Sequence, residues 1–230
     1  NADDRNGRVM VQNTAAAVSA YSLRAMADFR CKIVEMHLDG MLLRIDGQEL
    51  WVGLLGRFNA YNLLAVYGAA ALLGLNRGEV LRVLSMLHAV SGRFEKIRAA
   101  NGTTAIVDYA HTPDALENVI QTIEEIRTPG QQLIVVCGCG GDRDRTKRPE
   151  MAAIAVKYAT TAVFTSDNPR HESPEAILDD MVAGLEPGAR YLRIADRAEA
   201  IRTAVMLSRP GDILLIADRE STRLNSSHLS

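Results

Sequence analysis

The segment "TSDNPRHESP" (residues 165–174) concentrates chemically useful side chains in a short stretch. It follows the apolar run "TTAVFT" and places four such residues in a row: Asp167, Asn168, Pro169 and Arg170. A carboxylate, an amide and a guanidinium beside a rigid proline could bind a molecule that carries both positive and negative charge. The same residues could also form an ordinary loop between a strand and a helix.

A second segment, "DYAHTPDA" (residues 108–115), offers the carboxyl of Asp108 and the imidazole of His111. Between a strand and a helix, these groups could hold a ribose, a metal-bound phosphate or a proton, which makes His111 a possible catalytic group. The alternative is a helix N-terminal cap beside a partly exposed histidine. Taken alone, the segment favours that alternative.

A third segment, "GCGGDRDRTKRPE" (residues 138–150), combines glycines with mixed charges. Glycine turns before a helix can expose backbone N–H groups to an anion, and Arg143, Lys147 and Arg148 could pair with a carboxylate or phosphate. A solvated loop is the alternative, and the mixed charge argues against a nucleic-acid patch. The segment matches neither G-x-x-x-x-G-K-[ST] nor G-x-G-x-x-G.

Two further segments, "GRFNAYN" (residues 56–62) and "SGRFE" (residues 91–95), place polar groups beside a predicted helix. Asn59 and Asn62 are three residues apart and therefore share one helix face. Capping of the helix by Asn59 is the alternative to a binding role.

Hydrophobic periodicity predicts the elements that position these segments. Residues 8–55 contain short alternating runs separated by two Asp-Gly turn signals, which predict a small antiparallel layer. Two helices follow, over residues 59–74 and 76–87.

From residue 104 onward strands and helices alternate. Strands are predicted over 104–108, 132–137, 161–165, 191–194 and 212–217, with helices over 113–127, 149–158, 174–185 and 196–208. This alternation predicts an α/β fold with a mostly parallel sheet, in which the first three strands are neighbours. Ligands of such sheets bind beyond the carboxyl ends of the strands, where the three charged segments would converge.

The composition limits the possible classes of protein. The chain has 230 residues, 47% of them hydrophobic, and a net charge of −2, which gives no indication of a nucleic-acid partner or of a membrane span. Its first residues are unlike a signal peptide. The three cysteines, Cys31, Cys137 and Cys139, lack disulfide spacing and favour a reducing, cytoplasmic environment. The Cys-Gly-Cys sequence is predicted to be two buried thiols rather than a metal site.

Six motifs in this order resemble the Mur ligase family: "NADD", "GRFNAYN", "SGRFE", "VDYAHTPDAL", "GGDRDRTKRPEM" and "TSDNPRHESP". The resemblance covers essentially residues 1–217, and the Asp-Asn-Pro-Arg sequence resembles the branch that adds meso-diaminopimelate. It implies an ATP- and Mg²⁺-dependent ligase of peptidoglycan biosynthesis. Such a ligase converts a carboxylate of a UDP-N-acetylmuramoyl dipeptide into an acyl phosphate, which the amine of diaminopimelate attacks.

The resemblance also implies domains and residue roles. Residues 1–92 would be the distal part of a central ATPase domain, and residues 93–217 a Rossmann-like amino-acid-binding domain. Asn62, Arg93 and Asp108, with His111, would approach the nucleotide. The residues implied to hold diaminopimelate are Arg143, Asp167, Asn168, Pro169 and Arg170.

The sequence departs from the family pattern at both ends. A P-loop, a UDP-sugar domain and a carbamylated lysine are expected upstream of Asn1, and residues 218–230 are expected to be a disordered, non-native tail. The chain is therefore expected to be a monomeric fragment that cannot ligate by itself. Two alternatives remain: a ligase similar to folylpolyglutamate synthase, and a non-catalytic module that binds an amino acid or nucleotide.

Overall fold

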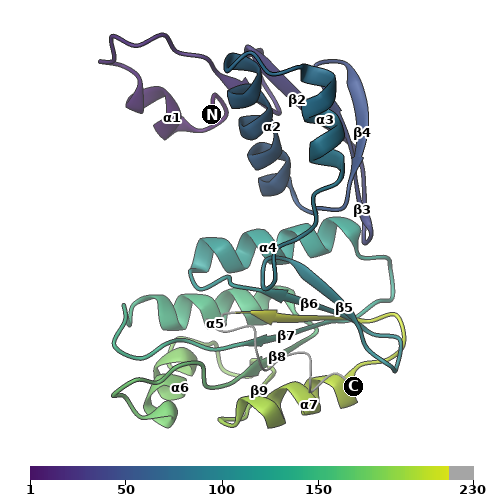
Figure 1. Cartoon of the computed structure of the whole chain (residues 1–230). Helices are drawn as coiled ribbons and strands as arrows, with labels where there is room; N and C mark the ends of the chain where they lie inside the picture. Colours follow the sequence, from purple (N-terminus) through teal and green to yellow (C-terminus); the bar gives the residue numbers. More distant parts are fainter. Residues whose placement is uncertain (218–230) are drawn as a thin grey trace. The chain divides into compact units, whose positions relative to one another are not determined.

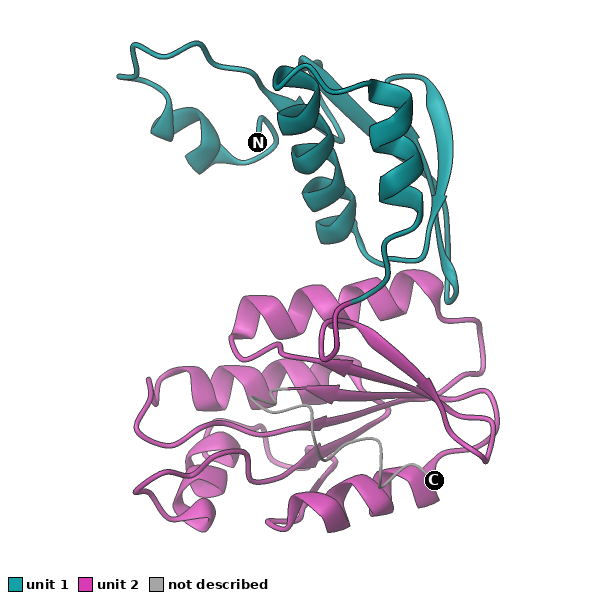
Figure 2. Ribbon diagram, viewed as in Figure 1, with its two compact units in different colours: residues 1–89 teal, residues 90–230 magenta. Residues whose placement is uncertain are grey.

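The computed structural model describes residues 1–217 (Figure 1). The predicted tail, residues 218–230, lies outside the described residues. The chain divides into two compact units, residues 1–89 and 90–230, which Figure 2 shows in different colours. The sequence-based boundary after residue 92 is three residues further along the chain.

Unit 1 combines a four-stranded sheet with three helices. Its elements are α1 (Arg5–Met10), β1 (Tyr21–Ser22), β2 (Phe29–His37), β3 (Gly40–Ile45), β4 (Gln48–Val52), α2 (Arg57–Leu72) and α3 (Arg77–Ser85). The prediction of strands from residue 8 onward is wrong for residues 8–10, which belong to α1. Asp4 begins this helix, because its side chain accepts a hydrogen bond from the backbone N–H of Asn6. The layer is also not wholly antiparallel, since β1 pairs with β2 in parallel.

The loop between β3 and β4 lies at the predicted Asp46-Gly47 signal, whereas the loop between β2 and β3 is Leu38-Asp39, one residue before the predicted Asp39-Gly40 signal. Asp46 and Gly47 both have positive φ, 45° and 86°, as a two-residue hairpin loop between β3 and β4 requires. Gly40 opens β3, and a Cβ atom there would lie 2.4 Å from the carbonyl oxygen of Val52. Gly40 is therefore required because a larger residue would collide with the neighbouring strand.

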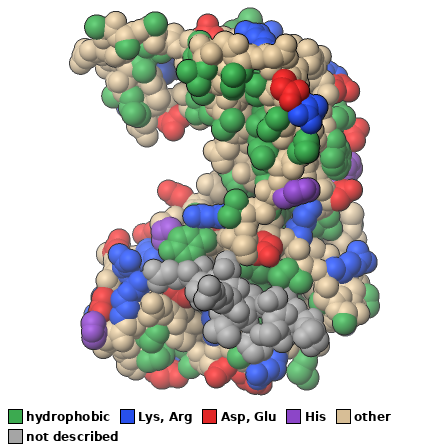
Figure 3. Space-filling view, viewed as in Figure 1, with side chains coloured by type: hydrophobic (Ala, Val, Ile, Leu, Met, Phe, Trp, Pro, Cys, Tyr) green, Lys and Arg blue, Asp and Glu red, His purple; other side chains and the backbone are tan. Residues whose placement is uncertain are grey.

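Helix α2 packs against β2 through aromatic side chains. The rings of Phe29 and Tyr67 meet edge to face with centroids 6.1 Å apart, and Gly68 leaves room for the Phe29 ring. The helix is apolar on its other side too, where Val66 and Leu72 are exposed. Figure 3 shows hydrophobic side chains gathered over the visible face of unit 1.

Unit 2 is built on one six-stranded sheet with strand order β5-β6-β10-β7-β8-β9. Its strands are β5 (Glu95–Arg98), β6 (Thr104–Asp108), β7 (Leu133–Cys137), β8 (Thr161–Phe164), β9 (Tyr191–Arg193) and β10 (Ile213–Ala217). All pairs are parallel except β5 with β6. The predicted adjacency of the first three strands holds for β7 and β8 but is wrong for β6. The last strand, β10, lies between β6 and β7, and all its residues are buried.

The helices of unit 2 form two layers over this sheet. They are α4 (Pro113–Ile126), α5 (Lys147–Tyr158), α6 (Pro174–Val182) and α7 (Arg197–Leu207). Helix α5 packs between α4 and α6, and α7 covers the opposite face (Figure 1). The core under α7 consists of Ala105, Val107, Ile134, Val136, Val163, Ala200, Ile201, Ala204, Leu214 and Ile216. Within residues 1–217, no helix is long and apolar enough to span a membrane.

Candidate functional site

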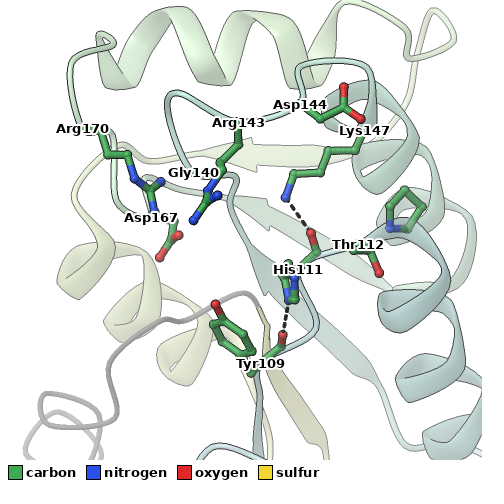
Figure 4. A pocket seen from close by; sticks show the side chains of 10 residues that line it. Tyr109, His111, Thr112, Gly140, Arg143, Asp144, Lys147, Asp167 and Arg170 are labelled. Atoms are coloured by element: carbon green, nitrogen blue, oxygen red, sulfur yellow. Dashed lines mark hydrogen bonds between the residues drawn. The ribbon is translucent and has the colours of Figure 1, made fainter.

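A pocket of about 390 Å³ lies at the carboxyl edge of the sheet in unit 2. Its walls come from the loops after β6, β7 and β8. The lining residues are Tyr109, His111, Thr112, Pro113, Gly140, Arg143, Asp144, Lys147, Asp167 and Arg170. Figure 4 shows Arg143, Asp167 and Arg170 gathered on one side of the pocket, with His111, Thr112 and Lys147 on the other. The predicted convergence of the three charged segments is therefore observed.

The glycines after β7 allow their loop to pack directly against the loop after β8. A Cβ atom on Gly138 would lie 2.4 Å from the carbonyl oxygen of Thr165, and one on Gly141 would lie 1.9 Å from that of Pro169. The N–H of Gly141 donates to the carbonyl oxygen of Asn168 at 2.8 Å. Within this contact the glycines are needed for close approach between two backbones.

Arg170 ties the loop after β8 to the glycine loop. Its Nη1 donates to the carbonyl oxygen of Gly141 at 2.8 Å, and its backbone N–H donates to Oδ1 of Asn168. Arg170 has a φ of 49°, a left-handed conformation that is uncommon for a residue with a side chain. This conformation and the bond to Gly141 fix the direction of the guanidinium, which lines the pocket beside Asp167.

The suggestion that Arg148 pairs with a ligand is wrong. Its side chain is 0% exposed, and its Nη atoms lie 2.7 Å from carboxylate oxygens of Glu172 and of Asp180. Burial of a guanidinium is tolerated when carboxylates and carbonyl oxygens accept its hydrogen bonds, and Nη2 also donates to the carbonyl oxygen of Gly140 at 3.3 Å. Arg148 therefore stabilises the loops that line the pocket without lining it.

The hydrogen bond from Arg148 lowers the pKa of Glu172 to about 2, with a further contribution from the backbone N–H of Asp142. A carboxylate whose pKa is lowered on folding stabilises the folded state above its unfolded pKa of about 4.3. That stabilisation is lost as the pH falls from about 4.3 toward 2.

We expect Glu172→Gln to abolish this pH dependence. The loss of stability that the variant causes should be largest at neutral pH and should shrink as the pH falls from about 4.3 to 2. The difference in stability between wild type and Glu172→Gln is measured by urea unfolding at several pH values. Pulsed hydrogen exchange of peptides from unit 2 monitors the unfolding. If the stability difference between the two proteins stays constant between about pH 4.3 and 2, the low pKa does not belong to Glu172.

Asp108 lies beneath the pocket and does not line it. Its side chain accepts from the backbone N–H of Phe94 at 2.8 Å, the residue is 6% exposed, and burial raises its pKa. Arg93 is exposed, and its guanidinium carbon lies 5.0 Å from the centre of the Tyr109 ring. Asp108 therefore anchors the segment that carries Arg93, while Tyr109 forms a wall of the pocket.

His111 and Lys147 connect the loop after β6 to the start of α5. Lys147 Nζ donates to the carbonyl oxygen of His111 at 2.6 Å, and Nδ1 of His111 lies 3.0 Å from the carbonyl oxygen of Tyr109. The helix cap proposed as the alternative role for this segment is supplied by Thr112, which accepts from the N–H of Ala115. The imidazole of His111 is thus exposed at the pocket.

The predicted site residue Asn62 lies on α2 of unit 1, where its side chain is exposed. Its Nδ2 atom is 3.4 Å from Oδ1 of Asn59, so the two residues share a face as predicted. Asn59 does not cap the helix, because the cap position is Gly56. The side-chain amide of Asn59 instead donates to the carbonyl oxygen of Leu55.

The three cysteines are buried and form no disulfide, as predicted for Cys137 and Cys139. Burial raises the pKa of Cys31 to about 12, which makes it a poor nucleophile. Among residues 1–217 there is no group of three or more His, Cys, Asp or Glu side chains that could hold a metal ion.

Five lining residues were not singled out as site residues from the sequence: Tyr109, Thr112, Pro113, Gly140 and Asp144. Each belongs to one of the three segments that were proposed to converge. Their position directly after a strand predicts that they lie in a loop at the carboxyl edge of the sheet. It does not predict which side chains face the pocket and which face the core.

Comparison with known proteins gives relatives that share most of this chain. It is 55% identical over 221 residues to the UDP-N-acetylmuramoyl-L-alanyl-D-glutamate--2,6-diaminopimelate ligase of Parabacteroides distasonis, covering 95% of this chain and 46% of that protein. A solved structure with the same enzyme name aligns with a TM-score of 0.62 and 37% identity, over 96% of this chain and 47% of the other. The chain spans about half the length of the curated relatives it matches.

A more distant structure shares the fold alone. Folylpolyglutamate synthase from Thermotoga maritima aligns with a TM-score of 0.64 but only 19% identity, over 84% of this chain and 44% of the other. The family described as "Mur ligase, glutamate ligase domain" matches residues 92–217, more than half of the chain. Because this family model matches more than half of the chain, the chain belongs to the Mur ligase family.

Proposed function

We propose that this chain is the amino-acid-binding part of an ATP-dependent ligase. The ligase would add meso-2,6-diaminopimelate to UDP-N-acetylmuramoyl-L-alanyl-D-glutamate in peptidoglycan biosynthesis. The observation that carries the proposal is the pocket in which Arg143, Asp167 and Arg170 come together, in a chain 55% identical to a ligase of that name.

The charges around the pocket complement diaminopimelate, which has two carboxylates and two amines. Arg170, with Arg143 beside it, would bind the distal carboxylate, because a guanidinium can donate two parallel hydrogen bonds to it. Asp167 would accept from the distal ammonium. Asn168 and Pro169 would act through the backbone, since their carbonyl oxygens accept from Gly141 and Glu172 within the two loops.

The ligation requires an activated carboxylate. The terminal phosphoryl group of ATP would be transferred to the carboxylate of the muramoyl dipeptide, the free amine of diaminopimelate would attack the acyl phosphate, and phosphate would leave as the amide forms. Lys147 and His111 lie on the side of the pocket opposite Arg170 (Figure 4), where anionic groups of the other substrates could approach.

The nucleotide would be approached by Asn62, Arg93 and His111, whose side chains are exposed. Asp108 would contribute by anchoring the Arg93 segment, because its carboxylate already accepts from Phe94. The described residues do not include a group of three or more His, Cys, Asp or Glu side chains that could hold Mg²⁺. Three buried cysteines without a disulfide fit a reducing, cytoplasmic environment. We also propose that the ligase is a monomer.

An amide-ligation assay with the full-length protein that contains this chain tests the proposal. With ATP and the muramoyl dipeptide, we expect diaminopimelate to be incorporated with one ADP released for each amide, and lysine to be a poor substrate. Turnover of folate and glutamate would support the folylpolyglutamate alternative. Diaminopimelate binding without ADP release would support a non-catalytic module.

A further inference from the structure

The buried cation Arg148 has no role in the chemistry proposed above, yet it contacts two of the three loops that line the pocket. From α5, its Nη2 donates to Oε1 of Glu172 at 2.7 Å and to the carbonyl oxygen of Gly140 at 3.3 Å. Its Nη1 donates to Oε2 of Glu172 at 2.9 Å and to Oδ2 of Asp180 at 2.7 Å. The guanidinium therefore joins the loop after β7, the loop after β8 and helix α6.

Glu172 extends this contact toward the pocket. Its Oε1 accepts from the backbone N–H of Asp142 at 2.6 Å, next to Gly141, whose carbonyl oxygen receives the hydrogen bond from Arg170. Asp142 has a φ of 50° and Arg170 a φ of 49°. Such left-handed residues persist only when the surrounding contacts determine their conformation. Arg148 and Glu172 bridge both loops with ionised groups, in addition to the bond from Arg170 and a contact of His171 Nδ1 with Asp142 Oδ2 at 2.6 Å.

We propose that Arg148, through Glu172, is a positioning residue for the amino-acid substrate. It holds the loop of Gly140–Asp142 and the loop of Asp167–Glu172 in register, so that Arg143 and Arg170 face the same ligand. The inference rests on the proposed function of the pocket. Because Arg148 is 0% exposed, it acts without touching the substrate.

The substitution Arg148→Lys keeps the positive charge but removes the planar guanidinium that reaches four acceptors. In the full-length protein we expect Arg148→Lys to raise KM for diaminopimelate by about ten- to a hundredfold, as a misplacement of about 1 Å can do. KM for ATP should stay within about twofold of wild type. Glu172→Gln should shift KM for diaminopimelate in the same direction by a smaller factor, because neutral acceptors bind guanidinium more weakly.

The matched control is Arg145→Lys. Arg145 pairs with the same Asp180 of α6 at 2.8 Å, but its side chain is 63% exposed. Its side-chain hydrogen bonds in the described structure reach neither the Gly140–Asp142 segment nor the loop after β8. We expect KM for diaminopimelate to stay near the wild-type value in this variant. Equal effects of the substitutions at 145 and 148 would overturn the proposal.

Hydrogen exchange of the amides of Gly141 and Asp142, measured without substrate, separates loop positioning from the identity of the ligand. Exchange there should become faster in Arg148→Lys and remain unchanged in Arg145→Lys. If the wild-type protein does not use diaminopimelate, the proposed function is wrong. The exchange rates of Gly141 and Asp142 still test whether Arg148 holds the loops in place. If wild type is active but exchange and KM are unchanged in Arg148→Lys, the positioning role is overturned. Should that variant not fold, Glu172→Gln decides by the same two measurements.

Discussion

Replacing Arg170 with alanine in the full-length protein should lower kcat/KM for diaminopimelate by about ten- to a hundredfold. The estimate follows from losing a charged hydrogen bond worth about 1.5–3 kcal/mol. The alanine retains a Cβ atom, so the left-handed backbone of residue 170 is strained to a similar degree in both proteins. KM for ATP should change little, because the guanidinium lies on the side of the pocket assigned to the amino acid (Figure 4).

Lysine as a substrate distinguishes recognition from a structural role of Arg170. Because lysine has no distal carboxylate, Arg170→Ala should affect its use much less, and the preference for diaminopimelate over lysine should narrow. Steady-state kinetics with both amino acids and with ATP varied provide the measurement. If activity with both amino acids declines equally, Arg170 acts only through its bond to Gly141, and the proposed recognition is wrong.

Substituting Gly141 with alanine should separate the loop after β7 from the loop after β8. The added Cβ atom would lie 1.9 Å from the carbonyl oxygen of Pro169, a backbone atom, so the loops must move apart. We expect kcat/KM for diaminopimelate to fall by about a hundredfold. Overpacking of this kind should also destabilise unit 2 by about 1–3 kcal/mol. Kinetics and urea unfolding check the two effects.

Gly78→Ala is the control for that substitution. Gly78 lies in α3 of unit 1, and a Cβ atom there would come no closer than 3.4 Å to its nearest neighbour, Oδ1 of Asn76. Alanine is also favoured over glycine within a helix by about 1 kcal/mol. This variant should therefore keep the wild-type kinetics. Wild-type kinetics for Gly141→Ala as well would show that the contact with Pro169 does not hold the pocket in shape.

Local patterns in the sequence were sufficient to predict most elements of unit 2. Pro113 begins α4 next to the Thr112 cap, and the apolar runs became strands because their side chains are buried on both faces of the sheet. The sequence did not predict the short helix α1, which is too short for periodicity to reveal and depends on one cap at Asp4.

What the sequence determined by itself is the alternation of strands and helices, and with it the edge where the charged segments meet. Only the tertiary structure decided the insertion of β10 between β6 and β7, because strand order depends on long-range pairing that leaves no local signal. It also decided that Arg148 is buried while Arg143 lines the pocket. Both arginines lie in one charged segment. Which of them pairs with carboxylates depends on the loop after β8 and on α6, which supply Glu172 and Asp180.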